Sequence, residues 1–535
     1  MRRRTLLASA ALPLWGCQPP PALEGGFSGT QPERGHRLRE PVPTGAPART
    51  RTVHTLILGG GVTGLAAARA LRQRGHEDFA VLELEDNAGG NARAGVLGGM
   101  AHPLGAHYLP LPGDDAPEVQ DLLEELGLRS RVAGRWVYDE RHLCHSPQER
   151  LLFNGQWQDG LLPVQGVGAD TLAQYRRFAG LVAEARKRSH WAIPVKKSRL
   201  ALEDIALTAI TFKAWLDRQG LTDVHLRWYL DYCCRDDYGA GLATVSAWAG
   251  VHYFASRHGF SAPGTEGGER EAVLTWPEGN AWLTQRLAAP VGGRLRTGRV
   301  VLRVVEQRHG VTVDAWDSHA QQFERWQGQH AIVALPLHVA LRVMEAPPDF
   351  LRHAAAAVVH APWLVANLQL DAALRDRAGA APSWDNVLYG TAGLGYVDAM
   401  HQQLHSVPGA TVLTHYRTLM SDANGIPPHQ VAQQARAQLL QAPWEHWRDT
   451  VLAELTQAHP DLPSKLRRLD ITRYGHAMAC PAPGFASQMG LQPAWNKDST
   501  LPKTKRLTFA HSDWSGYSIF EEAFASGHAA GRGTA

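Results

Sequence analysis

The feature that most constrains the fold of this chain is a short apolar run that ends in a cluster of glycines and is followed by a helix-forming run. Residues 53–58, Val-His-Thr-Leu-Ile-Leu, are typical of a buried strand, and residues 65–71 favour a helix. Between them lies Gly-Gly-Gly-Val-Thr-Gly, residues 59–64. A strand, a tight glycine turn and a helix in this order form the first unit of a Rossmann-type fold. The sequence therefore predicts an α/β domain that begins at residue 53.

The residues of this turn have predicted roles in binding a dinucleotide. Gly59 permits the turn, Gly61 lets the backbone approach a pyrophosphate, and Gly64 allows the helix to pack closely against the strand. The helix N-terminus, with Val62 and Thr63, offers backbone N–H groups to the anion. All five residues are therefore predicted to bind a cofactor.

An acidic residue after the second predicted strand indicates the kind of nucleotide. Residues 79–83, Phe-Ala-Val-Leu-Glu, read as that strand, and Glu83 stands at its end, near the spacing expected for a ribose ligand. A carboxylate at this point would repel a 2′-phosphate, so FAD or NAD is favoured over NADP. The alternative is a solvated glutamate beside a glycine turn that binds nothing, which the complete strand, turn and helix disfavour.

A second glycine pair favours FAD over NAD. Gly89 and Gly90 would turn backbone amides toward the same pyrophosphate, and Arg93 could supply positive charge. This arrangement resembles the extended FAD fingerprint of the flavin-containing amine oxidase and protoporphyrinogen oxidase superfamily, in which an Arg or Lys often follows the glycine pair. Here Asn91 occupies that slot. The resemblance implies an FAD-dependent oxidoreductase.

Further segments are similar to this family in the family's order. Residues 105–108, Gly-Ala-His-Tyr, resemble the turn beneath the flavin ring, and residues 507–513 resemble the strand that ends in an acid near the ribityl chain. Residues 520–530 resemble the closing helix, whose N-terminus would favour negative charge on the flavin. Residues 295–305 and 330–336 look like strands that return to the FAD domain. The resemblance assigns these further residues to the cofactor site: Gly105, Ala106, His107, Val301, Asp513, Ile519 and Phe520.

The matching segments predict two interleaved domains. The FAD-binding domain is expected over residues 53–110, 270–340 and 470–535. A mixed α+β substrate domain, partly helical, is expected over residues 111–269 and 341–469. A chain of 535 residues is long enough for two cores.

The N-terminus has the pattern of an export signal. Residues 1–17 place three arginines before a short apolar run, too short to span a bilayer, and resemble a twin-arginine signal. Cys17 ends a sequence similar to a lipobox, so it could carry a lipid anchor, although Trp15 is bulky for such a box. Residues 18–52 are rich in Pro, Gly and Arg and predict a flexible linker. We expect an exported protein, periplasmic or anchored to the membrane as a lipoprotein.

Charge and cysteine content argue against several function classes. The net charge is only +3 and the sequence has no basic stripe, so nucleic acid is not an expected partner. The five cysteines lack the CxxC spacing of a zinc site, so no metal is expected. Cys233 and Cys234 lie in a dense polar and aromatic segment, residues 229–239, and are expected to be small buried hydrophobes without a disulfide bond. No GxSxG or HExxH hydrolase motif is present.

The flavin would carry out the redox step, so the candidate catalytic residues are those near flavin-like segments. Tyr108, His476 and Tyr517 are the candidates, with packing or surface roles as the alternative for each. Residues 363–370 resemble a strand on which many amine oxidases carry a lysine, and they contain none. We expect oxidation of an amine-bearing or similar small molecule by hydride transfer to flavin N5, with oxygen or an unknown acceptor. The alternatives are a flavin-binding protein without turnover and an NAD-dependent dehydrogenase.

Overall fold

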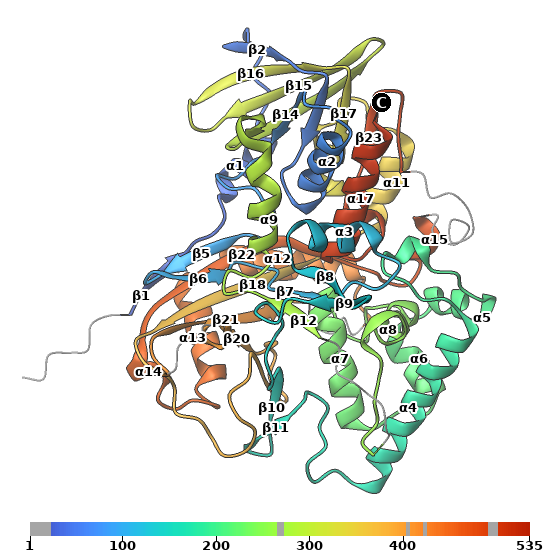
Figure 1. Cartoon of the computed structure of the whole chain (residues 1–535), viewed down its shortest axis with the longest axis vertical. Helices are drawn as coiled ribbons and strands as arrows, with labels where there is room; N and C mark the ends of the chain where they lie inside the picture. Colours follow the sequence, from blue (N-terminus) through green and yellow to red (C-terminus); the bar gives the residue numbers. More distant parts are fainter. Residues whose placement is uncertain (1–22, 265–271, 403–406, 421–424, 490–500, 535) are drawn as a thin grey trace, which may run out of the picture.

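The computed structural model describes residues 23–264, 272–402, 407–420, 425–489 and 501–534. Two domains interleave along the chain (Figure 1). The FAD-binding domain occupies the upper half of this view and the substrate domain the lower half, as a sheet on one side and a group of helices on the other. The predicted fold class is confirmed: a Rossmann-type α/β domain interleaved with a mixed α+β domain.

A parallel five-stranded sheet forms the centre of the FAD-binding domain. Its strand order is β13–β4–β3–β17–β23, with bounds Leu295–Arg296, Phe79–Leu82, Thr55–Leu58, His330–Val333 and Leu507–Phe509. Every residue of β3 and β4 is buried, as their unbroken apolar sequence predicts for strands covered on both faces. Helix α2 (Val62–Gln73) follows β3 and packs against α17 (Phe520–Gly533). A Cβ atom on Gly527 would lie 2.0 Å from the carbonyl oxygen of Thr63, so the two helix backbones are in close contact.

One predicted strand is two strands in the structure. The run at residues 295–305 is divided at Gly298, whose φ of +68° turns the chain. Strand β13 lies in the parallel sheet, whereas β14 (Arg299–Gln307) opens an antiparallel meander with β15 (Gly310–Asp317) and β16 (Gln322–Gly328). The alternating apolar sequence of this run fits either sheet, so the division could be found only at the glycine.

An eight-stranded sheet forms the main part of the substrate domain. Its order is β1–β22–β18–β21–β20–β19–β10–β11. Strand β18 (Val359–Leu370) lies inside the sheet, between β22 (Leu466–Cys480) and β21 (Thr411–Thr418). Because β22 belongs to this sheet, the last segment of the FAD-binding domain begins after residue 480, not at residue 470 as the sequence suggested. The remaining strands are β20 (Tyr396–Asp398), β19 (Asp385–Leu388), β10 (Glu149–Phe153) and β11 (Gln156–Asp159).

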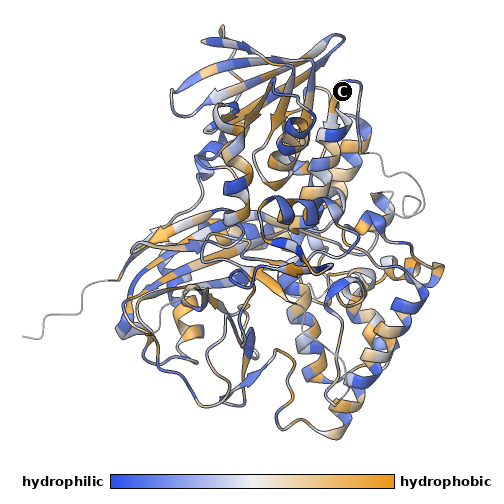
Figure 2. Cartoon of the chain, in the orientation of Figure 1, coloured by the Kyte–Doolittle hydropathy of each residue, from blue (hydrophilic) through white to orange (hydrophobic). Residues whose placement is uncertain are grey.

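Helices build the other part of the substrate domain. They include α4 (Ala169–Arg188), α6 (Phe212–Arg218), α7 (Val224–Tyr238) and α8 (Ala247–Tyr253). Figure 2 shows both hydrophilic and hydrophobic residues along α4, as expected for a helix with one face against a core. Cys233 and Cys234 on α7 are 1% exposed and free, which confirms the predicted absence of a disulfide bond between them.

The N-terminal segment differs from the prediction. Residues 18–52 were expected to be a flexible linker, but the described part forms β1 (Glu24–Phe27), α1 (Pro32–His36) and β2 (Arg49–Thr52). Strand β1 pairs with β22 and β2 pairs with β16, so tertiary pairing orders a segment that has no periodicity of its own. The predicted signal sequence, with Cys17, lies outside the described residues. Among the described residues, no helix combines the length and apolarity needed to cross a membrane.

Candidate active site

The glycine turn after β3 is shaped to accept a large ligand. Gly59 has φ +101°, and a Cβ atom there would lie 2.4 Å from the carbonyl oxygen of Ala334. A Cβ atom on Gly64 would lie 1.9 Å from the carbonyl oxygen of Gly59, so this glycine is required for helix packing. Gly61 is different, because the nearest atom to its Cβ position is the Cα of Gly90, 3.9 Å away. A Cβ atom on Gly61 would therefore make only an ordinary contact with protein, and Gly61 lies on the wall of a cavity that a ligand can enter.

Glu83 lies directly under this turn. Its Oε2 accepts a hydrogen bond from the backbone N–H of Gly60 at 2.7 Å, and its Oε1 accepts one from the N–H of Glu85 at 2.8 Å. Burial raises the pKa of Glu83, while these two N–H groups act in the opposite direction. Each carboxylate oxygen has a second lone pair, so the side chain can also accept hydrogen bonds from ribose hydroxyls.

The second glycine pair joins the first. The N–H of Gly89 donates to the carbonyl oxygen of Gly60 at 2.8 Å, which places Gly89 and Gly90 beside Gly61. Arg93 donates from Nε to the carbonyl oxygen of Gly90 at 2.9 Å, and its Nη2 lies 3.6 Å from Glu85. Arg93 is not among the residues found on the cavity wall described next, so its placement favours a role in supporting the glycine pair from behind.

These segments line one cavity, which we call the cofactor cavity. Its wall contains Glu83, Val301 and Asp513 and the first residues of α17. The N-terminus of α2 opens onto the same space. Of the predicted cofactor residues, the following lie on its wall: Gly59, Gly61, Val62, Thr63, Glu83, Gly89, Gly90, Ala106, Val301, Asp513, Ile519 and Phe520. The glycine-rich part of this wall, where Gly61, Gly89 and Gly90 carry no side chain, fits a bound FAD.

A histidine cluster surrounds Asp513. Oδ2 of Asp513 accepts hydrogen bonds from Nε2 of His360 at 2.9 Å and from the N–H of Leu337 at 3.0 Å, and His511 Nδ1 lies 3.2 Å from Oδ1. Burial opposes ionisation of Asp513, but His511 and His360 hold its pKa well below the usual range. His360 lies on β18, about 150 residues from Asp513 in the chain, and sequence reasoning missed it because no local motif marks it.

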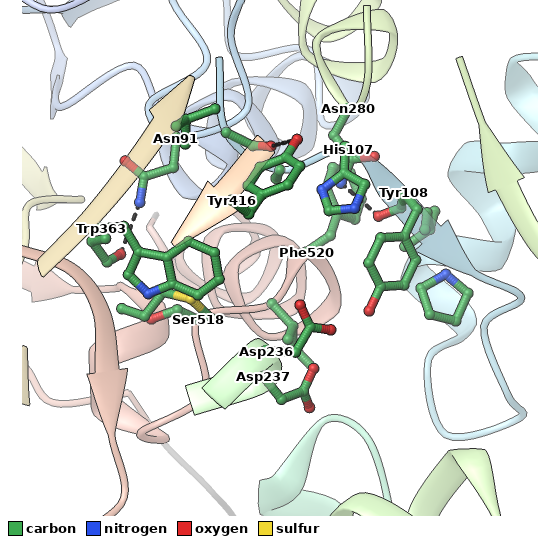
Figure 3. Close-up of a pocket in the computed structure, with 18 of the residues that line it drawn as sticks. Asn91, His107, Tyr108, Asp236, Asp237, Asn280, Trp363, Tyr416, Ser518 and Phe520 are labelled. Atoms are coloured by element: carbon green, nitrogen blue, oxygen red, sulfur yellow. Dashed lines mark hydrogen bonds between the residues drawn. The ribbon is translucent and has the colours of Figure 1, made fainter. Parts of the chain in front are cut away.

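A smaller cavity, which we call the inner cavity, adjoins the cofactor cavity. Asn91, Ala106, Asn280, Ile519 and Phe520 are among the residues that line both. Figure 3 shows its aromatic wall, with the rings of His107, Tyr108 and Tyr416 on one side and the indole of Trp363 on the other.

Two contacts fix this aromatic wall. The rings of His107 and Tyr416 stack with centroids 4.4 Å apart, and the hydroxyl of Tyr416 donates to the carbonyl oxygen of Gly105 at 2.9 Å. Burial lowers the pKa of His107 to about 3, so its imidazole is neutral at physiological pH. The wall therefore offers aromatic faces and no positive charge from His107.

A larger cavity, the outer cavity, continues from the inner one. His107, Tyr108, Asp236 and Tyr416 line both. Its other acidic wall residues are Glu149, Asp159 and Asp385, and Tyr232 and Trp384 add aromatic faces.

The acidic groups of the outer cavity repel one another. Burial raises the pKa of Asp385 well above the usual range, and Asp236 and Glu149 add to the shift. Burial also raises the pKa of Asp236 to about 6; Arg235 opposes this shift and Glu149 increases it. A bound cation would relieve this repulsion.

The three predicted catalytic residues lie in different places. Tyr108 lines the inner cavity, as a catalytic or substrate-contacting residue must. His476 lines the cofactor cavity and stacks on His338 with centroids 4.1 Å apart. Burial, together with the nearby His338 and Arg436, lowers the pKa of His476 to about 2, so it is a poor base near neutral pH. Tyr517 is 1% exposed and packs against Tyr238, Trp248 and His252 in the helical part, which favours a structural role.

The strand that resembles the lysine-bearing strand of the family is β18. The β18 residues on the wall of the inner cavity are Trp363 and Val365. Where many relatives have a cation at this strand, the chain therefore presents an indole and an aliphatic side chain.

Comparison with known proteins agrees with this architecture. The family model of flavin containing amine oxidoreductases matches residues 62–532. L-amino acid dehydrogenase of Synechocystis sp. is 25% identical over 315 residues, which cover 57% of this chain and 60% of that enzyme, less than two thirds of its length. A structure of putrescine oxidase bound to putrescine has a TM-score of 0.64 at 18% identity and covers 90% of this chain and 98% of the other. Cyclohexylamine oxidase from Brevibacterium oxydans has a TM-score of 0.61 at 18% identity, with the same coverage of both chains. The chain belongs to the family of flavin containing amine oxidoreductases.

Proposed function

We propose that this oxidoreductase oxidises a small primary amine that enters through the outer cavity and reacts in the inner cavity, passing a hydride to N5 of FAD. The observation that carries the proposal is the shared wall of the three cavities: the inner cavity meets the cofactor cavity at Ala106 and Phe520 and the acidic outer cavity at Asp236. A substrate can therefore contact the flavin region with one end and the acidic wall with the other.

The charge of the cavities supports a cationic substrate. Asp236, Asp385 and Glu149 place carboxyl groups on the wall of the outer cavity, and Asp236 and Asp237 place them on the wall of the inner one. Burial raises the pKa of Asp385, and a cation beside it favours its ionised form. An ammonium group attracts these carboxylates, and the rings of Tyr108, Tyr416 and Trp363 can stabilise it through cation–π contact. Amines are protonated in solution at neutral pH, so this wall matches the form in which they arrive.

The same charges disfavour an amino acid, although one relative is an L-amino acid dehydrogenase. A substrate carboxylate needs a cation that is not already engaged. Arg257 lines the inner cavity, and its guanidinium is bound to the carboxylate of Glu521, which is 1% exposed at its side chain. The acidic residues around it would repel a second carboxylate.

The chain's own residues would prepare the amine for reaction. FAD, when bound, supplies the acceptor for the hydride. The acidic wall holds the amine, the aromatic wall excludes water, and the neutral His107 avoids repulsion of the incoming cation. Ile519 and Phe520 open α17 at the wall shared by the inner and cofactor cavities, so the positive end of this helix favours negative charge there.

Anaerobic flavin spectroscopy tests the proposal. The purified holoenzyme is mixed with putrescine, cyclohexylamine or L-amino acids, and the flavin absorbance is followed. We expect loss of the oxidised flavin bands with the amines and slow or no loss with the amino acids. Reduction by amino acids alone would overturn the proposed substrate class, and a flavin that no amine reduces would favour a binding protein without turnover.

Two further points belong to the proposal. We expect export through the twin-arginine pathway, which carries folded proteins with their cofactor, and this is supported by the sequence of residues 1–17.

Oxygen uptake, measured beside the reduction of an artificial electron acceptor, would identify the oxidant. Labelling with a radioactive fatty acid, compared between the natural chain and Cys17→Ser, tests the lipid anchor.

A further inference from the structure

One residue on the wall shared by the cofactor and inner cavities has a buried polar atom without a protein partner. Asn280 is 3% exposed and lines both cavities, and its Oδ1 is buried without a hydrogen bond. A buried amide oxygen without a donor is costly, on the order of 1–3 kcal/mol. A site that leaves this acceptor open is therefore expected to fill it with a ligand or a water molecule.

The orientation of this amide is fixed by its other contacts. Nδ2 donates to the carbonyl oxygen of Tyr108 at 2.8 Å, and the backbone N–H of Asn280 donates to the carbonyl oxygen of Ala106 at 3.0 Å. Since a carbonyl oxygen can only accept, the nitrogen of the amide must face Tyr108. Exchange of the two amide atoms is thereby excluded, and Oδ1 is the atom left without a partner.

The position of Asn280 next to a helix makes this arrangement unusual. Asn280 directly precedes α9 (Ala281–Ala288), where an asparagine commonly caps the helix by accepting a hydrogen bond from the second or third N–H group. Here its side chain makes no such bond. Asn280, whose side chain leaves α9 uncapped, lies on the wall that the two cavities share (Figure 3).

We propose that Oδ1 of Asn280 accepts a hydrogen bond from the reacting amine nitrogen and thereby positions it at the entrance to the cofactor cavity. This inference rests on the proposed function. The ammonium ion that arrives must first give up one proton, which the Asp236 carboxylate on the wall of the inner cavity can accept. The neutral amine then has N–H groups to donate, and one of them held by Asn280 leaves the nitrogen lone pair free. Asp236 and Asp237 supply attraction for the charge, whereas Asn280 supplies direction. Asn280 is thus a positioning residue that contacts the substrate.

Two variants of Asn280 test this role, with amine binding and the rate of flavin reduction as the measured quantities. Asn280→Leu removes the acceptor together with the Nδ2–H donor to Tyr108, and Asn280→Asp loses the same donor but keeps an oxygen acceptor. Thr284→Val is the matched control: Thr284 is 1% exposed on the same helix and donates to the carbonyl oxygen of Ala92, and it is not among the residues found on the cavity walls. The probes are putrescine and cyclohexylamine, mixed anaerobically with each holoenzyme, and FAD affinity is measured separately by flavin fluorescence.

We expect Asn280→Leu to raise the apparent Kd of the amine about tenfold, equivalent to about 1.4 kcal/mol, with FAD affinity within twofold of the natural chain. Asn280→Asp should recover most of the binding, and Thr284→Val should leave it unchanged. Unchanged amine binding in Asn280→Leu would overturn the inference, because the oxygen would then hold only a water molecule. Loss of FAD affinity without loss of amine binding would also overturn it, by assigning the oxygen to the flavin. Failure of the natural chain to react with any amine would instead overturn the proposed function.

Discussion

A Cβ atom on Gly61 would point toward Gly90 and stop 3.9 Å from its Cα, with no closer atom among the described residues. A Cβ atom on Gly90 would lie 3.3 Å from the Cα of Gly61, so the two glycines pack side by side on the wall of the cofactor cavity. Gly64, three residues further along, is packed far more tightly, since its Cβ atom would lie 1.9 Å from the carbonyl oxygen of Gly59. Two glycines of one turn are thus required for different reasons, one by the ligand and one by the fold.

Substitution of these two glycines should separate cofactor binding from folding. Gly61→Val is expected to fold with nearly unchanged thermal stability of the apoprotein and to lose bound FAD, because the side chain fills the cradle. Gly64→Val should lower the free energy of unfolding by at least ~1–3 kcal/mol through overpacking. Flavin content after gel filtration and thermal unfolding of apoprotein measure the two effects. A Gly61→Val protein that retains stoichiometric FAD would contradict the placement of the diphosphate.

The local part of the fold could be predicted from the sequence, for physical reasons. The turn at residues 59–64 and the strand at 79–82 depend on glycine conformation and on apolar runs, which act over a few residues. The same holds for α17, whose helical sequence is continuous. The cavity walls could be anticipated only where a family motif marked them, as at residues 105–108.

Amine binding should weaken in acid because of Asp236. Its pKa is raised to about 6, chiefly by burial, so the carboxylate gains a proton as the pH falls through 6 and its attraction for a cation disappears. The apparent KM for putrescine should therefore rise below pH 6. In Asp236→Asn the KM should already be high, about tenfold at pH 8, and should lose this acidic limb. A pH profile of flavin reduction from pH 5 to 8 measures both, and an unchanged acidic limb in the variant would exclude Asp236 as its cause.

Acid should also destabilise the fold through His252. This imidazole is fully buried, with Nε2 donating to the carbonyl oxygen of Ala192 at 2.9 Å, and burial lowers its pKa to about 3. Between pH 6.5 and 3 the unfolded chain binds a proton here that the folded chain does not, so stability falls as the pH falls, by up to ~1.4 kcal/mol per pH unit.

Urea unfolding at several pH values tests this assignment. His252→Gln should be less stable than the natural chain at pH 7, because one hydrogen bond is disturbed, but its free energy of unfolding should depend on pH with a slope smaller by about one proton between pH 4 and 6. An equal slope in both proteins would show that His252 is not the group that titrates. Other buried histidines, including His107, would remain and keep part of the slope.

Retention of FAD should depend on the N-terminal strap, residues 24–39. Arg34 donates to the carbonyl oxygen of Leu84 at 3.0 Å and pairs with Asp86 at 2.9 Å, Arg37 lies over the ring of Trp316, and Leu38 reaches the wall of the cofactor cavity. Arg34→Ala combined with Arg37→Ala should release FAD several times faster than the natural chain during dialysis.

An exposed ion pair serves as the control for the strap. Arg352 is 55% exposed beside Asp349, and Arg352→Ala should leave FAD release unchanged. Equal release from the double variant and the natural chain would show that the strap does not hold the cofactor in place.

Other contacts of the site could not be read from the sequence, because they join residues that only the folded topology brings together. Asp236 lies on α7, and Asp385 is the first residue of β19, about 150 residues later in the chain. The dense polar and aromatic segment at residues 229–239 was visible, but nothing in the sequence showed that Asp236 shares the wall of one cavity with Asp385. The open acceptor of Asn280 is equally invisible, since a residue before a helix normally reads as a cap.

The pairing of β1 with β22, and of β2 with β16, has a consequence for how this protein can be handled. Each strand covers the outer side of a different sheet, β1 on β22 and β2 on β16. A shortened version that began at the glycine fingerprint would leave two rows of unpaired backbone N–H and C=O groups, open to pairing with other molecules. Such a protein should associate edge to edge and precipitate, even with its flavin-binding turn intact, so residues 24–52 are as necessary for solubility as any part of the catalytic body.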